Sequence, residues 1–451
     1  MTAASAAGRG GTSVHPAPSG FDIRQALPLP AFWLLAVLLL AGLVRIGTLL
    51  WAAFVEHPVA TSVAVGLFAL YAVPFWICVR ALDFFEREPP VLLAAAFAWG
   101  GLVATSAAIP GSGALQNLLA KLHSTEFTAA WGAAVAGPTV EEVVKTLGVV
   151  AIVLVARAQV NSVLDGVVYG ALVGLGFQVV EDVIYAVNAV VIAGGDDEVT
   201  PVVATFFVRG FLAGLWSHTL FGALAGAGIG YAVVRRDRSR PARTAMAGLA
   251  LAGAWACHFL WNSPLLADGP GAGGFGLLLV LLAKGVPSLA LILLVVRVAR
   301  HREADYYTAQ LAALGDPRIA TPGELRALGL GHLRADARRH AYQRAGRPAR
   351  RAVRRLQHAQ ARLAVELSRA AAAVPGAAPP YPDRRSEAGS DLDRWHDEVL
   401  TRRDHLRGLG HPEAVAPGPT QGPGRRIGAA VGLAVLVLAV AWVALSILGA
   451  A

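Results

Sequence analysis

Long uninterrupted apolar segments constrain this chain more than any other feature. A membrane-spanning helix needs about 20 mostly apolar residues, and nine segments approach or exceed that length. They fall at 31–54, 59–80, 91–110, 129–156, 164–192, 204–234, 245–266, 275–298 and 427–450. With 55% hydrophobic residues and a mean hydropathy of +0.54, the chain is excluded from the ordinary soluble proteins.

We therefore expect an all-α fold: a polytopic membrane helix bundle of about eight core helices plus a C-terminal ninth, with a basic, partly helical cytoplasmic segment. The expected domains are a flexible leader at 1–28, a membrane-embedded domain at 29–300, the basic segment at 301–425 and a C-terminal transmembrane helix at 426–451. The first apolar segment is too long for the core of a secretory signal, so we expect it to remain as an anchor.

The basic residues between the segments predict the orientation of the helices. Arginines gather in the leader and after the second, fourth and sixth segments, all on one side. The opposite loops carry Lys121 and an acidic group at 196–198. We expect a multi-pass protein of the cell membrane with a cytoplasmic N-terminus. Cys78 and Cys257 lie inside predicted spans without the spacing of a metal motif.

Residues 300–426 contain 23 arginines and 14 acidic residues, an excess that equals the net charge of +9 of the whole chain. Two stretches, 334–373 and 390–408, have helical character, the first with an apolar stripe at Leu356, Leu363 and Leu367. We expect this basic segment to lie against anionic lipid headgroups, at roughly 1 kcal/mol per arginine near the surface. No nucleic acid is expected, because the segment has no recognised nucleic-acid fold or interleaved aromatic pattern.

Polar clusters lie at mid-depth in four consecutive apolar segments. They are Glu141, Glu142 and Lys145; Glu181 and Asp182; His218; and His258 with Asn262. A charged side chain at the bilayer centre costs about 2.5 to 3.5 kcal/mol, so such groups usually face the inside of a bundle. Carboxylates beside imidazoles are suited to proton transfer or metal binding. We expect the four clusters to converge on one hydrophilic cavity.

The fourth segment carries two adjacent acids and one base. Glu141 and Lys145 share a helix face, and Lys145 can neutralise one carboxylate, which leaves the other for chemistry. An alternative is a capping box, in which Thr139 after Pro138 begins a helix with Glu142 three residues on.

The later clusters also admit a packing role. Gly170, Gly174 and Gly176 predict a close helix approach that brings Glu181 near its neighbours, although Glu181 could serve only as an interhelical hydrogen-bond partner. A lone membrane histidine more often has that role too, but two histidines beside carboxylates favour chemistry. Asn262 lies one turn after His258 and adds a neutral donor, which an oxyanion would need.

The ordered set of these motifs resembles the PrsW-type intramembrane protease family, relatives of the CAAX-processing and bacteriocin-immunity membrane proteases. The matching motifs are Glu-Glu-x-x-Lys at 141–145, Phe-x-x-x-Glu at 177–181, His218, His-x-x-x-Asn at 258–262, Glu86-Arg87-Glu88-Pro89 and Asp165-Gly166. The resemblance covers about residues 75–300. Asp182 stands where the family pattern has asparagine.

The resemblance implies an intramembrane endopeptidase that cleaves a single-pass membrane protein. Glu141 or Glu142 would take a proton from water and pass it to the leaving amine, with Glu181 and a histidine positioning that water. Asn262, with His258 or His218, would stabilise the oxyanion. Lys145 would balance the partner glutamate.

Metal dependence stays open at this point. The zinc-protease signature His-Glu-x-x-His, the rhomboid Gly-x-Ser-Gly and the presenilin-like Gly-x-Gly-Asp are absent from the sequence. Two histidines with glutamates could still bind zinc from three helices, and the set we expect is His218, His258 and Glu181. No other cofactor is implied.

Two further classes of function use the same residues. In a proton-coupled or solute transporter the carboxylates and histidines would form a relay, although the halves of the chain show no repeat of the kind common in transporters. In a non-catalytic membrane scaffold the basic segment would be the working part.

Overall fold

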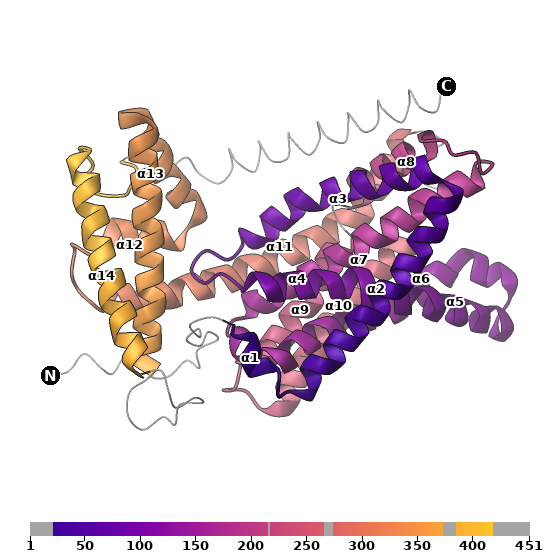
Figure 1. The fold of residues 1–451 in the computed structure, drawn as a ribbon, viewed down its shortest axis with the longest axis horizontal. Coiled ribbons are helices and arrows are strands. Elements are labelled where there is room, and N and C mark those ends of the chain that lie inside the picture. The colour runs from indigo at the N-terminus through magenta and orange to yellow at the C-terminus, as the bar shows by residue number, and fades with distance from the viewer. Residues whose placement is uncertain (1–20, 215–216, 266–273, 373–384, 418–451) are drawn as a thin grey trace. The chain divides into compact units, whose positions relative to one another are not determined.

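The computed structural model describes residues 21–214, 217–265, 274–372 and 385–417 (Figure 1). The all-α fold predicted from the sequence is confirmed. The chain divides into two compact units. The membrane unit comprises residues 21–82 and 88–296, and the helical unit comprises residues 83–87 and 297–417.

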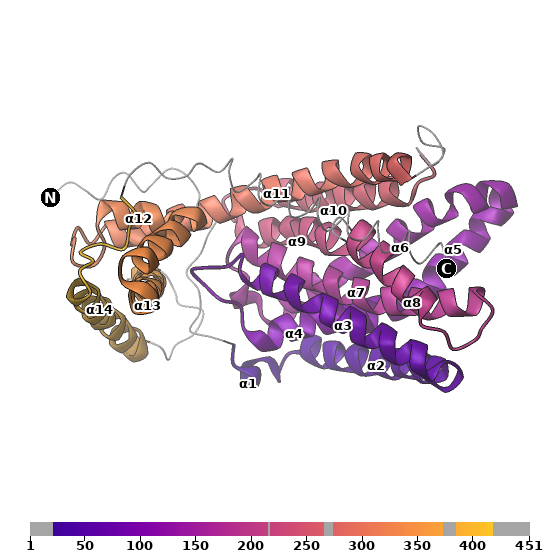
Figure 2. The same cartoon turned by 90° about the horizontal axis from the view of Figure 1, so that it is seen from above.

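The membrane unit is built from long helices joined by short connections. In chain order they are α1 (Ile23–Ala26), α2 (Pro30–Glu56), α3 (Pro58–Arg80), α4 (Pro90–Ala98), the π-helix η1 (Trp99–Ala104), α5 (Thr105–Leu122), α6 (Thr125–Val155), the 3-10 turn η2 (Arg157–Gln159), α7 (Val163–Ile192), α8 (Thr200–Thr205), the π-helix η3 (Phe206–Ala213), α9 (His218–Val234), α10 (Arg240–Asn262) and α11 (Gly274–Ala312). The hairpin of α5 and the first half of α6 projects from the bundle (Figures 1 and 2).

Local sequence signals set where these helices begin. Proline occupies the first position of α2, α3 and α4, where its missing N–H costs nothing and its fixed φ suits a helix. Ser162 and Asp165 form a capping box at the start of α7, which satisfies two backbone donors reciprocally. These starts lie within a few residues of the predicted ones.

The number of spans differs from the predicted nine. Six described helices are long and apolar enough to cross a membrane, and a bent pair, α8–η3 with α9, makes up to seven. The predicted fourth span, α6, is a continuous helix of 31 residues, but its central charges lower its hydropathy and it is not among the six. The predicted ninth span lies outside the described residues.

The sixth predicted span, 204–234, is a broken helix rather than a continuous one. It consists of η3 and α9, bent by 41° across a short break. A side chain at Gly214, at the end of η3, would overlap the Tyr71 hydroxyl and the backbone of Arg209, so the packing there leaves room only for glycine. The break makes His218 the first residue of α9, which places its imidazole at a helix start inside the bundle.

Glycines let α7 contact its neighbours backbone to backbone. A Cβ at Gly170 would overlap the carbonyl oxygen of Gly222 on α9, and one at Gly174 would overlap that of His218. On another face, a Cβ at Gly176 would overlap the carbonyl oxygen of Phe97. The close approach predicted for α7 is therefore present, and its α9 contact ends at His218.

The helical unit has its own apolar core. The last part of α11, α12 (Pro322–Gly329), α13 (Gly331–Ala372) and α14 (Arg385–Gly408) surround it. The predicted stripe lies in α13, with Leu356 and Leu363 fully buried and Leu367 packed at the edge. The segment 83–87 belongs to the same unit, because Phe85 stacks on Tyr307 and the Tyr307 hydroxyl donates to Glu86.

A buried ion pair lies within the helical unit. Arg403 contacts Glu324, and both side chains are 1% exposed. Glu324 also accepts from the backbone of Ala414 and the side chain of Gln360. The pair therefore joins α14, α12 and α13.

Replacing Arg403 by methionine should destabilise the helical unit by about 3 to 5 kcal/mol, because it leaves the Glu324 carboxylate buried without its cation. Arg402→Met is the matched control, since the neighbouring Arg402–Glu398 pair is partly exposed and such pairs contribute about 0 to 1 kcal/mol. The measurement is thermal unfolding of the full-length protein in detergent, followed by proteolysis within 297–417. Equal shifts for the two variants would contradict the prediction.

Candidate active site

Helix α6 carries Glu141, Glu142 and Lys145 without interruption. It runs from Thr125 to Val155 through Pro138, and the Thr139 hydroxyl donates back to the carbonyl oxygen of Val135. The capping-box alternative at Thr139 is therefore wrong, because no helix begins there. All three charged side chains are buried.

The two adjacent acids have different partners. Lys145 Nζ donates to Glu142 Oε1 at 2.5 Å, and both side chains are 1% exposed. Lys145 thus neutralises Glu142, which lies three residues before it. Glu141 lies four residues before Lys145 and forms no ion pair with a lysine among the described residues. A buried charge is tolerated when it is paired and hydrogen-bonded, so Glu142 is the carboxylate that the lysine stabilises in its charged form.

Lys145 also determines the tautomer of His218. Its Nζ lies 3.0 Å from His218 Nδ1, and an ammonium can only donate, so Nδ1 must accept. His218 then carries its proton on Nε2, which lies 3.0 Å from Glu181 Oε2. The imidazole is thereby fixed between a cation and a carboxylate.

His258 is held in the same manner from the other side. Its Nδ1 lies 2.8 Å from Glu142 Oε1, and its Nε2 lies 3.1 Å from Asn262 Nδ2. Asn262 Nδ2 also lies 3.3 Å from the carbonyl oxygen of Ala133, which identifies Nδ2 as the donor. His258 therefore donates from Nδ1 and accepts at Nε2, and the two imidazole rings meet edge to face at 4.9 Å.

Lys284 on α11 helps to place His258 and Asn262. Its Nζ donates to the carbonyl oxygen of Ser263 at 2.5 Å, just beyond the last residue of α10. The last carbonyls of a helix have no partner within it and carry partial negative charge. A buried lysine at that end therefore supplies a hydrogen-bond donor to the carbonyl oxygen that follows Asn262 and stabilises the last turn of α10.

Glu141 is the one acid of the cluster without a close partner. Its Oε2 is buried and has no hydrogen-bond partner among the described residues. The nearest imidazole nitrogens, His258 Nε2 and His218 Nδ1, lie 3.8 and 3.9 Å away, too far for a direct hydrogen bond. Gly137, one turn earlier, leaves space between Glu141 Oε1 and Asn262.

Arg209 on η3 belongs to the site and was missed in the sequence. Its guanidinium donates to Glu181 at 2.6 Å and to Asp182 at 2.5 Å, and it lies over the ring of Tyr185. Asp182, which stands where the family pattern has asparagine, thus has its charge balanced. A lone arginine inside the apolar run Phe206–Ala213 was the available signal, since such a residue needs a partner in the bundle.

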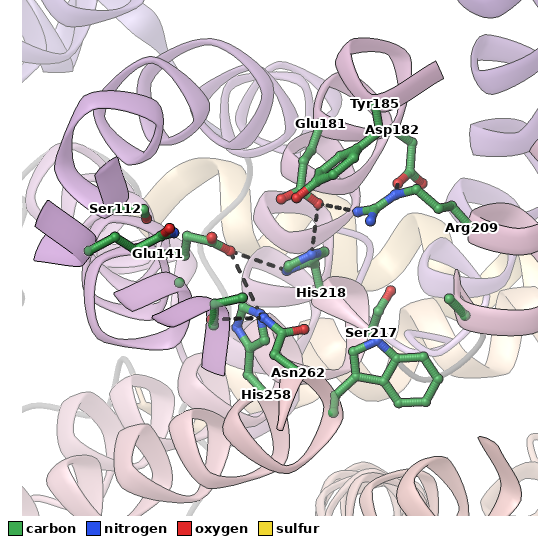
Figure 3. Close-up of a pocket in the computed structure, with 15 residues that line it drawn as sticks. Ser112, Glu141, Glu181, Asp182, Tyr185, Arg209, Ser217, His218, His258 and Asn262 are labelled. Carbon is green, nitrogen blue, oxygen red and sulfur yellow. Dashed lines mark hydrogen bonds and ion pairs between the residues drawn. The ribbon is translucent and has the colours of Figure 1, made fainter. Parts of the chain in front are cut away.

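A cavity of about 140 Å³ lies beside these groups, well above the volume that one water needs. Figure 3 shows Glu141 on one side, Glu181 and Arg209 on another, and His218 between them. His258 and Asn262 also line the cavity, whereas Glu142 and Lys145 are not among its lining residues. The predicted convergence of the four clusters on one pocket is thus present in the structure.

The residues that could hold a metal are Glu141, His218 and His258, whose ligand atoms all lie within 4.8 Å of one another. The set expected from the sequence had Glu181 in place of Glu141. Glu181 Oε2 instead contacts His218 Nε2 and Arg209, while Glu141 Oε2 is a buried atom at the cavity without a hydrogen-bond partner among the described residues. Two imidazoles and a carboxylate are a donor set that suits zinc, so the residues fit a metal.

The carboxylates behind the histidines strengthen that fit. Metal-binding histidines usually donate their second N–H to a carboxylate, carbonyl or water. His258 Nδ1 faces Glu142 and His218 Nε2 faces Glu181. Each imidazole therefore turns its accepting nitrogen toward Glu141.

A family model described as PrsW family intramembrane metalloprotease matches residues 88–292, somewhat less than half of the chain. The matched segment contains every candidate site residue and lies inside the region of resemblance, with Glu86 and Arg87 just before it. This match supports intramembrane protease activity, and with the apolar helices it supports a multi-pass membrane protein. Comparisons with curated proteins and with solved structures found no match.

Proposed function

Because residues 88–292 belong to the PrsW family of intramembrane metalloproteases, we propose that this protein hydrolyses a peptide bond of a membrane protein with Glu141 as general base. One observation carries the choice of Glu141. Its Oε2 is buried at the cavity without a hydrogen-bond partner among the described residues, whereas Glu142 and Glu181 are each bound to a cation. A base must have a free lone pair within reach of the water that it activates.

The cavity is large enough for a water molecule beside Glu141. A water between Glu141 Oε2, His258 Nε2 and His218 Nδ1 would span gaps of 3.8 and 3.9 Å, which are too long for direct contact and favour a bridge. Lys145 and Asn262 already donate to these two nitrogens, so this water would donate to Glu141 and could donate to an imidazole only by replacing one of those donors. Glu141 then takes a proton as the water attacks and gives it to the leaving amine.

Asn262 is the donor that we assign to the oxyanion. Its Nδ2 lies on the cavity wall near Gly137, where a carbonyl oxygen could replace its contact with Ala133. A positioned neutral donor of this kind stabilises the developing charge. Glu142, Lys145 and Glu181 act as positioning residues, because they hold the two imidazoles. Glu181 also lines the cavity, but its carboxylate is bound to His218 and Arg209.

A metal would occupy the same place. If an ion binds, Glu141, His218 and His258 would hold it, and zinc in such a site polarises a carbonyl and activates a bound water. His218 Nδ1 would first have to lose its contact with Lys145 Nζ, and His258 Nε2 its contact with Asn262 Nδ2. Two positive charges about 3 Å apart repel strongly in a low-dielectric interior, which favours glutamate chemistry without an ion.

We expect cleavage to survive removal of metal. After treatment with phenanthroline and dialysis, the rate should remain near that of the untreated protein, because Lys145 occupies the histidine nitrogen that an ion needs. The measurement is the cleavage rate together with metal analysis of the same preparation. Stoichiometric zinc, with activity that is lost on chelation and regained on adding zinc, would contradict this prediction.

The expected substrate is a single-pass membrane protein, and the expected location is the cell membrane with the N-terminus in the cytoplasm. The direct test reconstitutes the full-length protein in liposomes with a labelled single-span substrate. Cleavage supports the proposal. Proton or solute flux without cleavage would instead favour a transporter, and folded protein with neither activity would favour a scaffold.

A further inference from the structure

The second half of α13 presents a stripe of arginines to solvent. Helix α13 breaks at Ala345 and Gly346, where Gly346 has φ of +69°, and a regular helix follows. The arginine stripe is defined by five exposed residues, Arg347, Arg350, Arg351, Arg354 and Arg355. Their spacing of three and four residues places them on one face, while Ala352, Val353 and Leu356 bury the opposite face in the core.

The arginine stripe is uncompensated within the described chain. No acidic residue occurs between Asp336 and Glu366, and none of the five arginines forms an ion pair with another described residue. Like charges at i,i+4 destabilise a helix, so a solvated face built only of arginine is costly by itself. A face that is merely soluble usually mixes both signs.

Helix α14 in the same unit shows that mixed arrangement. Arg394, Arg402 and Arg407 each have an acidic partner three or four residues earlier: Asp391, Glu398 and Asp404. The composition of the unit therefore does not account for the arginine stripe.

Burial and nearby arginines lower the pKa of two groups close to the arginine stripe. Burial, with Arg87, Arg338 and Arg354 nearby, lowers the pKa of His358 to about 4. Burial, with Arg300 and Arg338 nearby, lowers the pKa of Arg334 to about 9. Arginines beyond the arginine stripe thus add to the positive charge near this part of α13.

We propose that the arginine stripe binds the phosphate-bearing headgroups of anionic lipids. The unit that carries it is continuous with α11, a candidate membrane span, and the apolar segment 427–450 follows it in the sequence. A segment that continues from a membrane helix meets headgroups at high effective concentration. Arginine suits this ligand, because its planar fork binds phosphate in a bidentate manner.

Two features favour a lipid surface over a nucleic acid. Residues 343–365 contain no Phe, Tyr or Trp, whereas single-stranded nucleic acids are usually held by stacking on aromatic rings. Tyr342, just before the break in α13, is 47% exposed, and tyrosines with one wet end are enriched where lipid headgroups meet water.

The test follows a fluorescent label on the full-length protein in liposomes. With Cys78 and Cys257 replaced by serine, a single cysteine at Gln343 reports on the arginine stripe, and one at Asp397, on α14, serves as the reference site. Quenching by neutral acrylamide is compared in phosphatidylcholine and in vesicles containing about 30% phosphatidylglycerol. We expect anionic lipid to shield the label at 343 and not the label at 397, with the shielding lost at about 1 M salt.

Two variants with the same net charge distinguish an effect of the arginine stripe from an effect of net charge. The stripe variant changes four arginines to glutamine: Arg347, Arg350, Arg351 and Arg354. The control variant changes four exposed arginines elsewhere in the unit: Arg318, Arg326, Arg394 and Arg407. The stripe variant should weaken docking by on the order of a hundredfold or more and the control far less, with equal unfolding temperatures showing that both are folded.

The remaining outcomes overturn the proposal. If both variants lose the same amount of lipid docking, the effect depends on net charge and not on the arginine stripe. Shielding in phosphatidylcholine on addition of inorganic phosphate would assign the surface to free phosphate. Binding of a labelled oligonucleotide that depends on the arginine stripe, without shielding by anionic lipid, would assign it to nucleic acid.

Discussion

Glu141→Gln should lower the cleavage rate by about a thousandfold while the protein stays folded, because general base catalysis contributes factors of this order. Glutamine keeps the shape and the buried position of the side chain, but its amide cannot accept a proton from water. Since Glu141 Oε2 has no hydrogen-bond partner among the described residues, the change breaks no existing contact of that atom. The measurement is cleavage of the single-span substrate in liposomes, with thermal unfolding in parallel.

Two other glutamates make this prediction specific. Glu126→Gln, in the exposed first turn of the same helix, should leave the rate unchanged. Glu142→Gln should also reduce cleavage, but with a loss of stability of about 3 to 5 kcal/mol, because it leaves Lys145 buried without its carboxylate. If Glu141→Gln retains activity while Glu142→Gln loses it without loss of stability, the base is Glu142 and the proposed assignment fails.

Gly170→Val should prevent the membrane unit from folding. A Cβ at this position would overlap the carbonyl oxygen of Gly222 on α9, and backbone cannot move aside as a flexible side chain can. We expect a loss of about 3 kcal/mol or more, at the upper end for overpacking. The measurement is the yield of monodisperse protein in detergent and its unfolding temperature.

The matched control for this substitution is Gly47→Val on α2. A Cβ at Gly47 meets nothing within 4 Å, so the helix gains a valine without a clash. Its yield should match the wild type. Normal folding of Gly170→Val would mean that α7 and α9 are not held by close backbone contact.

Hydropathy and the polar clusters predicted most of the membrane unit. Six described helices are long and apolar enough to be found from composition alone, and proline or serine marks several of the starts. The break before His218 could not be found in this way, because residues 204–234 form one apolar run. At the end of η3, Tyr71 and Gln178 leave no room for a side chain at Gly214, and these two residues come from other helices.

The identity of the site residues was more predictable than their pairing. The free-energy cost of placing charged side chains in lipid predicted that they share a cavity. Helical spacing alone did not decide whether Lys145 pairs with Glu141 or with Glu142. His258, 116 residues away, binds Glu142 and completes that choice. The inclusion of residues 83–87 in the helical unit likewise depends on Glu86 and Tyr307, which are 221 residues apart.

The glycine contact between α7 and α9 also limits how a peptide can approach Glu141. The backbones of α7 and α9 touch at Gly166, Gly170 and Gly174, where there is no room for even one methyl group. This close contact extends along α9 to the carbonyl of His218. An extended strand needs about 5 Å beside its neighbour, so it cannot slip between these helices. A substrate would therefore have to enter through another part of the cavity wall, and the other helices that line the cavity include α5, with Ser112 and Gln116.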